Sequence, residues 1–420
     1  MKKYFVLNAA IAMLAILFQC VQAADCEEGF VPLFNGQNLT GWKIRGGYAT
    51  YKVEDGTIVG TCVPDTPGNT FLCTEKDYGN FILKFQTKFI EDTNSGCQFR
   101  SETKPDGDRE RVFGYQCELE PGGGVSGRIF DEGRRGFQHG YIWLDLNTPW
   151  ERCEAAREDW KAHEWNDVEI QAIGPSLKTW INGHLITDMY DCSTMKGLIG
   201  FQVHEGKSGK VAWKNIRIKD MGESKWKPFF IKDDQGNGKL NQSRFVLPEE
   251  WSFDNEEGVL HGVHKKSEKR DALVISNEQY DNFAVRVTYK MIDGNSGLCF
   301  RSEEVELPTL HLQGFQNEIA NNAKDSALWH SIGRWVAAND EIVEKVRNKE
   351  GWNTICTIAV GDRLVQTLNG FCTSDIENPL CEKTGKLGLQ MDGRIDNELF
   401  FKDWEVMELT SDMVKLIERK

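Results

Sequence analysis

Residues 94–102 read NSGCQFRSE, and nearly the same residues return in the second half of the chain, at 295–303, as NSGLCFRSE. A second stretch behaves alike, since GYQCE at 114–118 returns as GFQNE at 314–318. Shorter matches keep the same order along the chain: 74–78 with 276–280, Trp165-Asn166 with Trp352-Asn353, and Asn182-Gly183 with Asn369-Gly370. Collinear matches at one very long period indicate a duplicated unit and not a solenoid.

Both units are rich in strand-like runs, many of which alternate apolar with polar residues as half-buried antiparallel strands do. The runs are 81–89, 168–173, 177–181, 198–203 and 211–218 in the first unit, and 283–291, 354–360, 364–368, 386–390 and 399–407 in the second. Asn-Gly pairs between runs are typical of tight turns, because both residues tolerate a positive φ. The pattern predicts an all-β protein of two tandem antiparallel β-sandwich domains, 24–221 and 222–420. Only 150–161 and 411–419 look helical, so the second domain should end in a short C-terminal helix.

The first 23 residues have the three parts of a secretory signal. Lys2 and Lys3 form a basic start, 5–18 is apolar, and 21–23 (VQA) ends in a small residue suited to cleavage. Lipidation at Cys20 is the less favoured alternative, because the residues before it are bulky. We therefore expect an exported protein, periplasmic or secreted. No later apolar run approaches the ~20 residues of a membrane span, so none is predicted.

The net charge argues against nucleic acid as a partner, and the cysteines suggest disulfide bonds. Removal of the two signal lysines changes the formal net charge from -14 to -16, which disfavours nucleic acid as a partner. Eleven cysteines remain after cleavage, and in an oxidising compartment some are expected to pair. Cys62 with Cys73, and Cys372 with Cys381, are close enough in sequence to staple loops. The cysteines of this chain show no paired Cys-x-x-Cys spacing, so a zinc site is not predicted.

Polar residues crowd 115–135 of the first unit. On a strand, Gln116, Glu118 and Glu120 would share one face. The loop that follows adds Asp131, Glu132, Arg134 and Arg135. A solvated sheet face with surface ion pairs would also explain such a pattern. Because Gln116 and Glu118 return in the second unit as Gln316 and Glu318, we favour a cleft.

Arg100 and His204 are two further candidates. Arg100 and its counterpart Arg301 end matching strands, where a guanidinium can bind a carboxylate or sugar oxygens bidentately; pairing with a local glutamate is the alternative. His204 lies in FQVHE at 201–205, whereas the second unit has QMD at 390–392 and no histidine there. A histidine present in one copy alone predicts a role specific to that copy.

The first unit as a whole resembles the 3-keto-disaccharide hydrolase domain family. The residues that carry the resemblance are GFVPLFNG at 29–36, LTGW at 39–42, VEDG at 53–56, LCTE at 72–75, NSG at 94–96, GYQCE at 114–118, TWING at 179–183, QVH at 202–204 and WKNIRI at 213–218. The resemblance implies a concanavalin-like jelly roll, the fold of laminarinase-type glycosidases. The second unit follows the pattern loosely, since 326–329 and Trp335 stand where the first unit has 126–129 and Arg135.

The resemblance also implies action on glycosides oxidised to a ketone at C3 of the sugar. Such a ketone acidifies the C2 hydrogen, so a base can remove it and the C1 substituent can leave by elimination, with net hydrolysis after water adds. The base would be Glu118 or His204, and Arg100, Arg134 or Arg135 would stabilise the enolate oxygen or bind hydroxyls. Alternatively, a divalent metal held by Glu118, His204 and Asp131 could polarise the ketone. Further expected substrate-binding residues are Tyr115, Gln116, Asp131, Glu132 and Gln202.

Two other functions have to be weighed. Retaining glycosidases of this fold carry a Glu-x-Asp-x-x-Glu strand, which this chain lacks, so direct hydrolysis of an unoxidised glycoside is disfavoured. A non-catalytic carbohydrate-binding sandwich is the main alternative to the enzyme. Sugar binding alone would need aromatic and amide groups but no titratable base, so the predicted grouping of Glu118, Arg134, Arg135 and His204 favours catalysis.

Overall fold

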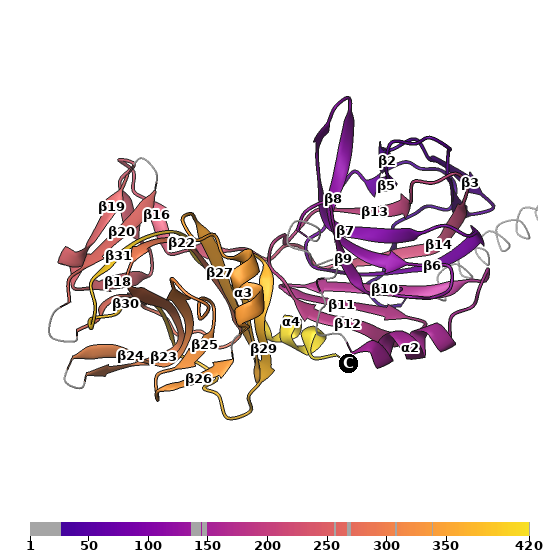
Figure 1. Cartoon of the computed structure of the whole chain (residues 1–420). Coiled ribbons are helices and arrows are strands. Elements are labelled where there is room, and N and C mark those ends of the chain that lie inside the picture. The colour runs from indigo at the N-terminus through magenta and orange to yellow at the C-terminus, as the bar shows by residue number, and fades with distance from the viewer. Residues whose placement is uncertain are drawn as a thin grey trace, which may run out of the picture.

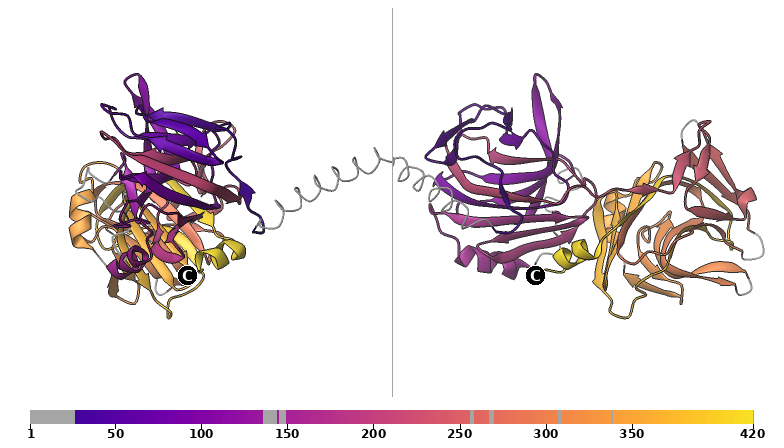
Figure 2. Two further views of the ribbon diagram at one scale, coloured as in Figure 1. Left: turned by 90° about the vertical axis from the view of Figure 1, so that its right-hand side faces the viewer. Right: turned by 180° about the vertical axis from the view of Figure 1, so that it is seen from behind.

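The computed structural model describes residues 27–135, 144, 149–255, 258–266, 270–306, 309–337 and 339–419, so the predicted signal at 1–23 lies outside the described residues. Figures 1 and 2 show two β-sandwiches side by side, joined by a single passage of the chain between Asp220 and Lys227. The prediction of an all-β protein with two tandem antiparallel sandwiches is confirmed. No helix in the described part combines the length and apolar character that a membrane crossing requires.

Unit one consists of an eight-stranded and a six-stranded antiparallel sheet. The eight-stranded sheet has the order β12 (His184–Tyr190), β11 (Ser176–Ile181), β10 (Asn166–Ile173), β6 (Phe81–Glu91), β14 (Lys210–Asp220), β4 (Thr57–Thr61) and β3 (Thr50–Glu54), with β1 (Val31–Pro32) on β14. The six-stranded sheet has the order β2 (Trp42–Gly46), β5 (Thr70–Thr74), β13 (Leu198–Val203), β7 (Ser95–Asp106), β8 (Arg109–Leu119) and β9 (Ile129–Glu132). The helix α2 (Trp150–Glu158) lies beside β12.

Unit two repeats this strand order and adds one strand at the edge of its second sheet and a two-stranded ribbon. One sheet has the order β19 (Trp251–Asp254), β20 (Val259–His264), β31 (Asn397–Glu408), β22 (Phe283–Asp293), β27 (Asn353–Val360), β28 (Arg363–Leu368) and β29 (Phe371–Glu377), with β15 (Lys227–Pro228) on β31. The other has β18 (Ser243–Val246), β21 (Ala272–Ser276), β30 (Lys386–Met391), β23 (Asn295–Glu306), β24 (Leu310–Ala320), β25 (Leu328–His330) and β26 (Arg334–Ala337). The ribbon of β16 (Phe230–Lys232) and β17 (Gly238–Leu240), the turn η2 (Pro248–Glu250) and the helices α3 (Asp340–Val346) and α4 (Ser411–Ile417) complete it.

All ten predicted runs lie in strands of the structure, and both predicted helices exist, with α2 and α4 ending two or three residues before the expected bounds. The helix α3 was not predicted. It has only seven residues, and its apolar positions Ile342, Val343 and Val346 are too few to show a period in the sequence.

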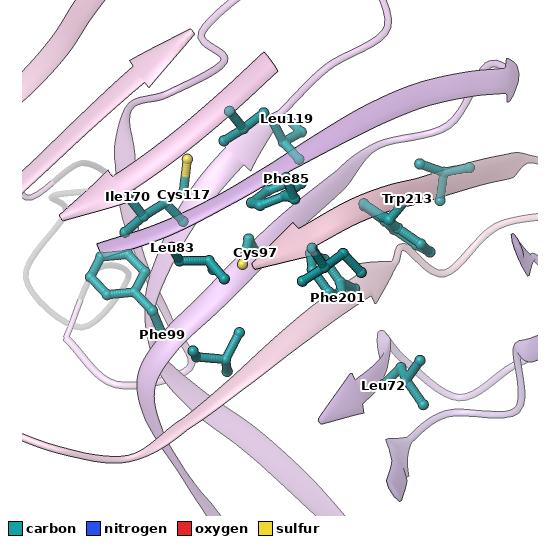
Figure 3. Close-up of a cluster of buried hydrophobic side chains, with 14 of the residues drawn as sticks. Leu72, Leu83, Phe85, Cys97, Phe99, Cys117, Leu119, Ile170, Phe201 and Trp213 are labelled. Atoms are coloured by element: carbon teal, nitrogen blue, oxygen red, sulfur yellow. The ribbon is translucent and has the colours of Figure 1, made fainter. Parts of the chain in front are cut away.

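Strand alternation determines which side chains of the six-stranded sheet enter the core. On β8, Tyr115, Cys117 and Leu119 are buried in the core of unit one, so Gln116 and Glu118 point to the opposite face. We call this opposite face the outer face. Figure 3 shows the core side, where Cys97 and Cys117 pack with aromatic rings that include Phe85 and Phe201.

The same alternation extends to the neighbouring strands. On β9, Asp131 pairs with Tyr115 and therefore shares its face, whereas Glu132 pairs with Gly114 and lies on the outer face. On β13, Phe201 enters the core, which leaves Gln202 on the outer face.

Strands β7 and β8 continue past the sheet as a long hairpin, which Figure 1 shows projecting from unit one. The register shifts between Phe99 and Glu102, and beyond this bulge the hairpin leans toward β2, where Glu110 pairs with Lys43 and Arg45. A small apolar cluster lies between hairpin and sheet: Phe71, Cys73, Val112 and Leu198. The outer face therefore has a cover on its β2 side.

The two units are packed against each other and not merely tethered. One apolar cluster draws Ile173, Tyr190 and Cys192 from unit one, and Cys356, Ile358 and Met407 among others from unit two. Gln171 Nε2 donates to Leu416 O at 3.0 Å, so the C-terminal helix α4 of unit two is held on β10 of unit one. Arg363 Nη1 donates to Asp188 Oδ1 at 2.7 Å across the same boundary.

Candidate active site

The repeated Asn-Ser-Gly sequence builds a holder for one glutamate. Asn94 Nδ2 donates to Glu118 Oε1. Ser95 Oγ donates to the backbone oxygen of Gln202 at 2.8 Å, which joins β7 to β13. A Cβ on Gly96 would come within 2.6 Å of the Gln116 side chain, so only glycine leaves room for that amide to lie across β7. Asn94 thus binds Glu118 directly, Ser95 ties β7 to β13, and Gly96 makes room for the Gln116 side chain.

Glu118 ends a chain of side-chain hydrogen bonds on the outer face. Ser101 Oγ donates to Gln98 Oε1 at 2.6 Å, Gln98 Nε2 to Gln116 Oε1 at 2.9 Å, and Gln116 Nε2 to Glu118 Oε2 at 2.9 Å. Together with Asn94, this gives both carboxylate oxygens of Glu118 an amide donor. The carboxylate is therefore held in one orientation.

Burial tunes Glu118 to neutral pH. Its residue is only 6% exposed, and this desolvation raises the carboxyl pKa to about 7, against the pull of the amide donors from Asn94 and Gln116 toward lower values. The negative charges of Glu120 and Glu132 raise this pKa further. A carboxylate whose pKa lies near the working pH can both take and return a proton, which is what a general base needs.

Gln202 supplies an amide with no partner in the described structure. It is fully buried, yet neither Nε2 nor Oε1 has a hydrogen-bond partner. Buried amides are nearly always satisfied, so a bare one on a polar face points to a missing water or ligand. Gln202 follows Phe201, which pairs with Cys97, and Gly96 pairs with Glu118, so Gln202 and Glu118 flank Gly96 on neighbouring strands.

His204 and Glu132 border the same region. The backbone N–H of His204 donates to Asn94 O at 3.3 Å, and His204 Nδ1 lies 2.8 Å from Glu205 O. Desolvation raises the pKa of the Glu132 carboxyl, while nearby Arg111 and His204 lower it. The charge of Glu132 also raises the pKa of Glu118, so the two carboxyl groups are near enough to interact electrostatically.

A pocket of about 230 Å³ opens beside these residues, under the β7–β8 hairpin. Glu132, Glu205 and Arg111 contribute charged groups to its lining, and Asn69 and Phe71 come from the β5 side. Arg111 Nη2 lies 3.7 Å from Glu132 Oε1. Arg111 is thus a guanidinium at the outer face, and the sequence analysis did not single it out because it lies outside the dense stretch 115–135.

Asp131, Arg134 and Arg135 form a different cluster, on the core side of the sheet. Arg134 Nη2 and Arg135 Nε donate to the two oxygens of Asp131, each at 2.7 Å. Arg135 Nη1 also donates to Asp191 Oδ2 at 2.8 Å, and Tyr115 donates its hydroxyl to Asp191 Oδ1. These opposite charges raise the pKa of Arg135 and lower that of Asp191 despite full desolvation.

This cluster belongs to the boundary between the units. Arg135 Nη1 donates to Gly370 O of unit two at 2.7 Å, and its guanidinium lies 5.9 Å from the centre of the Phe371 ring. The expected single hollow shared by Glu118, Arg135 and His204 is therefore not present. Asp131 and Glu132 are neighbours in sequence but point to opposite faces of β9, as strand geometry requires.

Arg100, expected to bind substrate, is fully buried and bonded to backbone. Its guanidinium donates to Gly79 O at 2.8 Å and to Gly174 O at 2.7 Å. Arg301 does the same in unit two, with Asp281 O and Gly361 O. Both arginines have a positive φ, 44° and 46°, at the bulge where the hairpin bends away. The paired position therefore has a structural task, which explains why both units keep it.

The candidate metal ligands do not fit a divalent cation. Within the ranges that the structure describes, no group of three or more His, Cys, Asp or Glu side chains converges as metal ligands. Both oxygens of Glu118 face amide donors, and Asp131 is occupied by two guanidiniums on the other face of the sheet. We derive no step through a metal.

The register also corrects the expected alignment of unit two by one residue. Gly127 donates its N–H to Glu118 O, and Ser326 donates in the same way to Glu318 O, so Ser326 corresponds to Gly127 and not to Ser126. Both have a positive φ, 88° and 57°. Unit two is therefore one residue shorter between its glutamate and this turn. The sequence comparison missed this deletion because Ser126 and Ser326 are the same residue type.

The model of the 3-keto-alpha-glucoside-1,2-lyase-like domain matches the chain twice, at residues 29–219 and 225–407. The chain belongs to this family. It carries two tandem copies, one in each sandwich, as the resemblance of the sequence implied. Membership indicates a glycosyl-hydrolase-like, carbohydrate-active protein. A search of curated proteins found no match to the chain.

Several solved structures are similar to one copy of this family's domain. A proposed glycosyl hydrolase from Parabacteroides distasonis is 24% identical, with 46% of this chain and 95% of that chain covered and a TM-score of 0.34. The carbohydrate-binding module CBM66 from Bacillus subtilis is 16% identical, with coverages of 42% and 94% and a TM-score of 0.29. A Bacillus subtilis protein with a galectin-like fold is 12% identical, with coverages of 45% and 93% and a TM-score of 0.30.

Proposed function

We propose that unit one cleaves glycosides whose sugar carries a ketone at C3, and that it does so outside the cytoplasm after removal of residues 1–23. The family supports the substrate class, and the outer face supplies groups of the right kind. The observation that carries the proposal is Glu118, a buried carboxyl with a pKa of about 7, next to the unpartnered amide of Gln202.

Proton abstraction would begin the reaction. Glu118 takes the hydrogen at C2 as a proton, and the electron pair left behind moves onto the C3 oxygen as an enolate. The amide N–H of Gln202 is available to donate to that oxygen, since nothing in the described structure occupies it. A donor already in place costs no reorganisation when the charge develops.

Elimination and hydration complete the cleavage. The enolate returns its electrons, the C1–C2 double bond forms, and the bond from C1 to the glycosidic oxygen breaks. His204, at the rim beside Glu205, would give a proton to the leaving oxygen. Water then adds across the double bond: its oxygen bonds to C1, one of its protons passes to His204, and Glu118 returns a proton to C2, which yields the free 3-keto sugar.

A direct test compares a chromogenic 3-keto-glucoside with its unoxidised parent. The proposal expects release from the ketone alone, and slower release when the C2 hydrogen is replaced by deuterium. Equal release from both compounds would show ordinary glycoside hydrolysis. Tight binding of the 3-keto compound without release would show the alternative, a carbohydrate-binding sandwich with no catalysis.

A further inference from the structure

Two cysteines meet at the boundary between the sandwiches. Cys192 follows β12 of unit one, and Cys356 lies within β27 of unit two. Their sulfur atoms are 2.7 Å apart, and both residues are buried in the apolar cluster that joins the units.

We propose that Cys192 and Cys356 form a disulfide bond that locks the two units together. A disulfide has a sulfur–sulfur distance of about 2.0 Å, so less than an ångström of movement separates the two thiols from the bonded state. The contact joins residues that are far apart in sequence and belong to different domains. Chance proximity within one strand pair therefore cannot account for it.

The pairs that loop spacing suggested do not form in the structure. Cys62 is bonded through Sγ to Gly206 O at 2.9 Å, whereas Cys73 is buried under the hairpin. Cys372 Sγ faces Ser374 O, and Cys381 Sγ accepts from Arg301 Nη1 at 3.3 Å. Short sequence spacing was thus a poor guide, because these side chains make other contacts in the folded unit.

The bond would form by thiol–disulfide exchange with a donor disulfide, such as oxidised glutathione. The thiolate of one cysteine attacks a donor sulfur, which gives a mixed disulfide and releases one donor thiolate. The second cysteine then attacks the first and releases the other donor thiol. The two protein thiols are oxidised, the donor disulfide is reduced to two thiols, and the two protons pass to the released donor.

Burial sets the order of events. Desolvation raises the pKa of the Cys356 thiol, and the neighbouring Cys192 raises it further, so few thiolates exist once the units have docked. Exchange should therefore occur while the units are still closing, during folding in the oxidising compartment that residues 1–23 predict. The docked, reduced protein should react slowly with the same donor.

The bond would also fix part of unit one. Asp191 and Ser193, on either side of Cys192, both accept from Arg135 Nη1. Arg135 in turn holds Asp131 of β9, the strand that carries Glu132 on its outer face. The crosslink would anchor the turn at 191–193, and with it the strand next to the candidate site.

Peptide mapping tests the bond on the whole protein. The chain is refolded with oxidised glutathione, blocked with iodoacetamide in denaturant, and digested with trypsin without reductant. We expect one species that joins 179–196 to 350–363, lighter than the two peptides by two hydrogens and split by reductant. Iodoacetamide adducts on both Cys192 and Cys356, or linkage of Cys192 to another cysteine, would overturn the proposal.

A second test uses the linker between the units. A protease site is inserted between Gly222 and Lys225, and the cut protein is run on a denaturing gel without reductant. The parent protein should stay one covalent species, and Cys192→Ser should separate into two. Cys62→Ser, a matched control in unit one, should stay joined. Separation of the parent protein would contradict the bond, and neither test depends on catalytic activity.

Discussion

The two units hold the same carboxylate in the same way and surround it differently. Asn295 Nδ2 donates to Glu318 Oε1 at 2.5 Å and Gln316 Nε2 to Glu318 Oε2 at 3.1 Å, as Asn94 and Gln116 do for Glu118. Burial raises the pKa of Glu318 to about 7, the same value as for Glu118. The holder alone therefore cannot distinguish an active copy from an inactive one.

The differences lie around the holder. Asp392 occupies the place of His204, since both donate their backbone N–H to the matching asparagine oxygen, and Asp392 is paired with Arg394. Gln390 Nε2 is bonded to Asp271 at 2.8 Å, whereas the corresponding Gln202 is bare.

Ser331 pairs with Gly314 through its backbone, where unit one has Glu132 opposite Gly114. Unit two thus keeps the carboxylate, but it has Asp392 at the position of His204 and a bonded amide, Gln390, at the position of Gln202. The comparison teaches that the repeated residues preserve the sheet, and that the residues which differ between the copies carry the proposed chemistry.

The strongest test replaces the carboxylate in each unit. Glu118→Gln should lower turnover of a 3-keto-glucoside by about 10²–10⁴-fold, the usual loss of a general base. The matched variant Glu318→Gln should leave turnover unchanged within about twofold, because Asp392 stands at the position of His204 and the amide of Gln390 is already bonded. Steady-state kinetics on both variants checks this, and equal losses in the two would remove the distinction between the units.

The pH profile comes next. The base must be ionised, so with a Glu118 pKa of about 7 the release of a nitrophenyl group, which needs no proton from His204, should rise with pH and level off above pH 7. Below pH 7 it should fall about tenfold per unit, or about 10²-fold at pH 5. The Glu318→Gln variant should have the same profile. A profile that is flat between pH 5 and pH 8 would exclude Glu118 as the base.

Stability should respond in both units. The folded pKa of each glutamate, about 7, lies above its ordinary 4.5, so its contribution to stability is full below pH 4.5 and is lost as pH rises through 7. The melting temperatures of Glu118→Gln and of Glu318→Gln should each fall less between pH 5 and pH 8 than that of the parent protein. An effect confined to one unit would mean that the two carboxyls are not equally buried in solution.

His204→Asp gives unit one the residue of unit two. We expect cleavage of a 3-keto-glycoside with an alkyl leaving group to fall by about 10²-fold, because its oxygen needs a proton to depart. A nitrophenyl leaving group needs no such help, so its release should change little. Equal losses on both substrates would indicate that His204 binds the sugar instead of protonating the leaving group.

The smallest expected effect concerns the free amide. Gln202→Leu should lower kcat about tenfold with little change in KM, as expected when a donor acts on charge that develops during the reaction. The matched Gln390→Leu should not affect turnover. A rise in KM alone would place the Gln202 amide on a part of the sugar that does not react.

Much of this protein could be predicted from periodicity, since alternating residues and Asn-Gly turns gave the strands of both sandwiches. The grouping of the candidate site could not. Dense charge at 131–135 suggested one hollow, yet Asp131 and Arg135 are part of the contact between the units while Glu132 faces outward. Alternation along β9 predicts that split, but the ends of β9 were not visible in the sequence.

The sequence by itself determined the duplication, the all-β class and the shared strand face of Gln116 and Glu118, because each depends on residues that are close in the chain or repeated in order. Only the tertiary structure decided that Arg100 is bonded to backbone carbonyls, that Gln202 is left without a partner, and that Cys192 meets Cys356. Those facts depend on which strands become neighbours and which way each side chain points. Such long-range contacts are set by packing of the two sheets and the two units, and no local pattern encodes them.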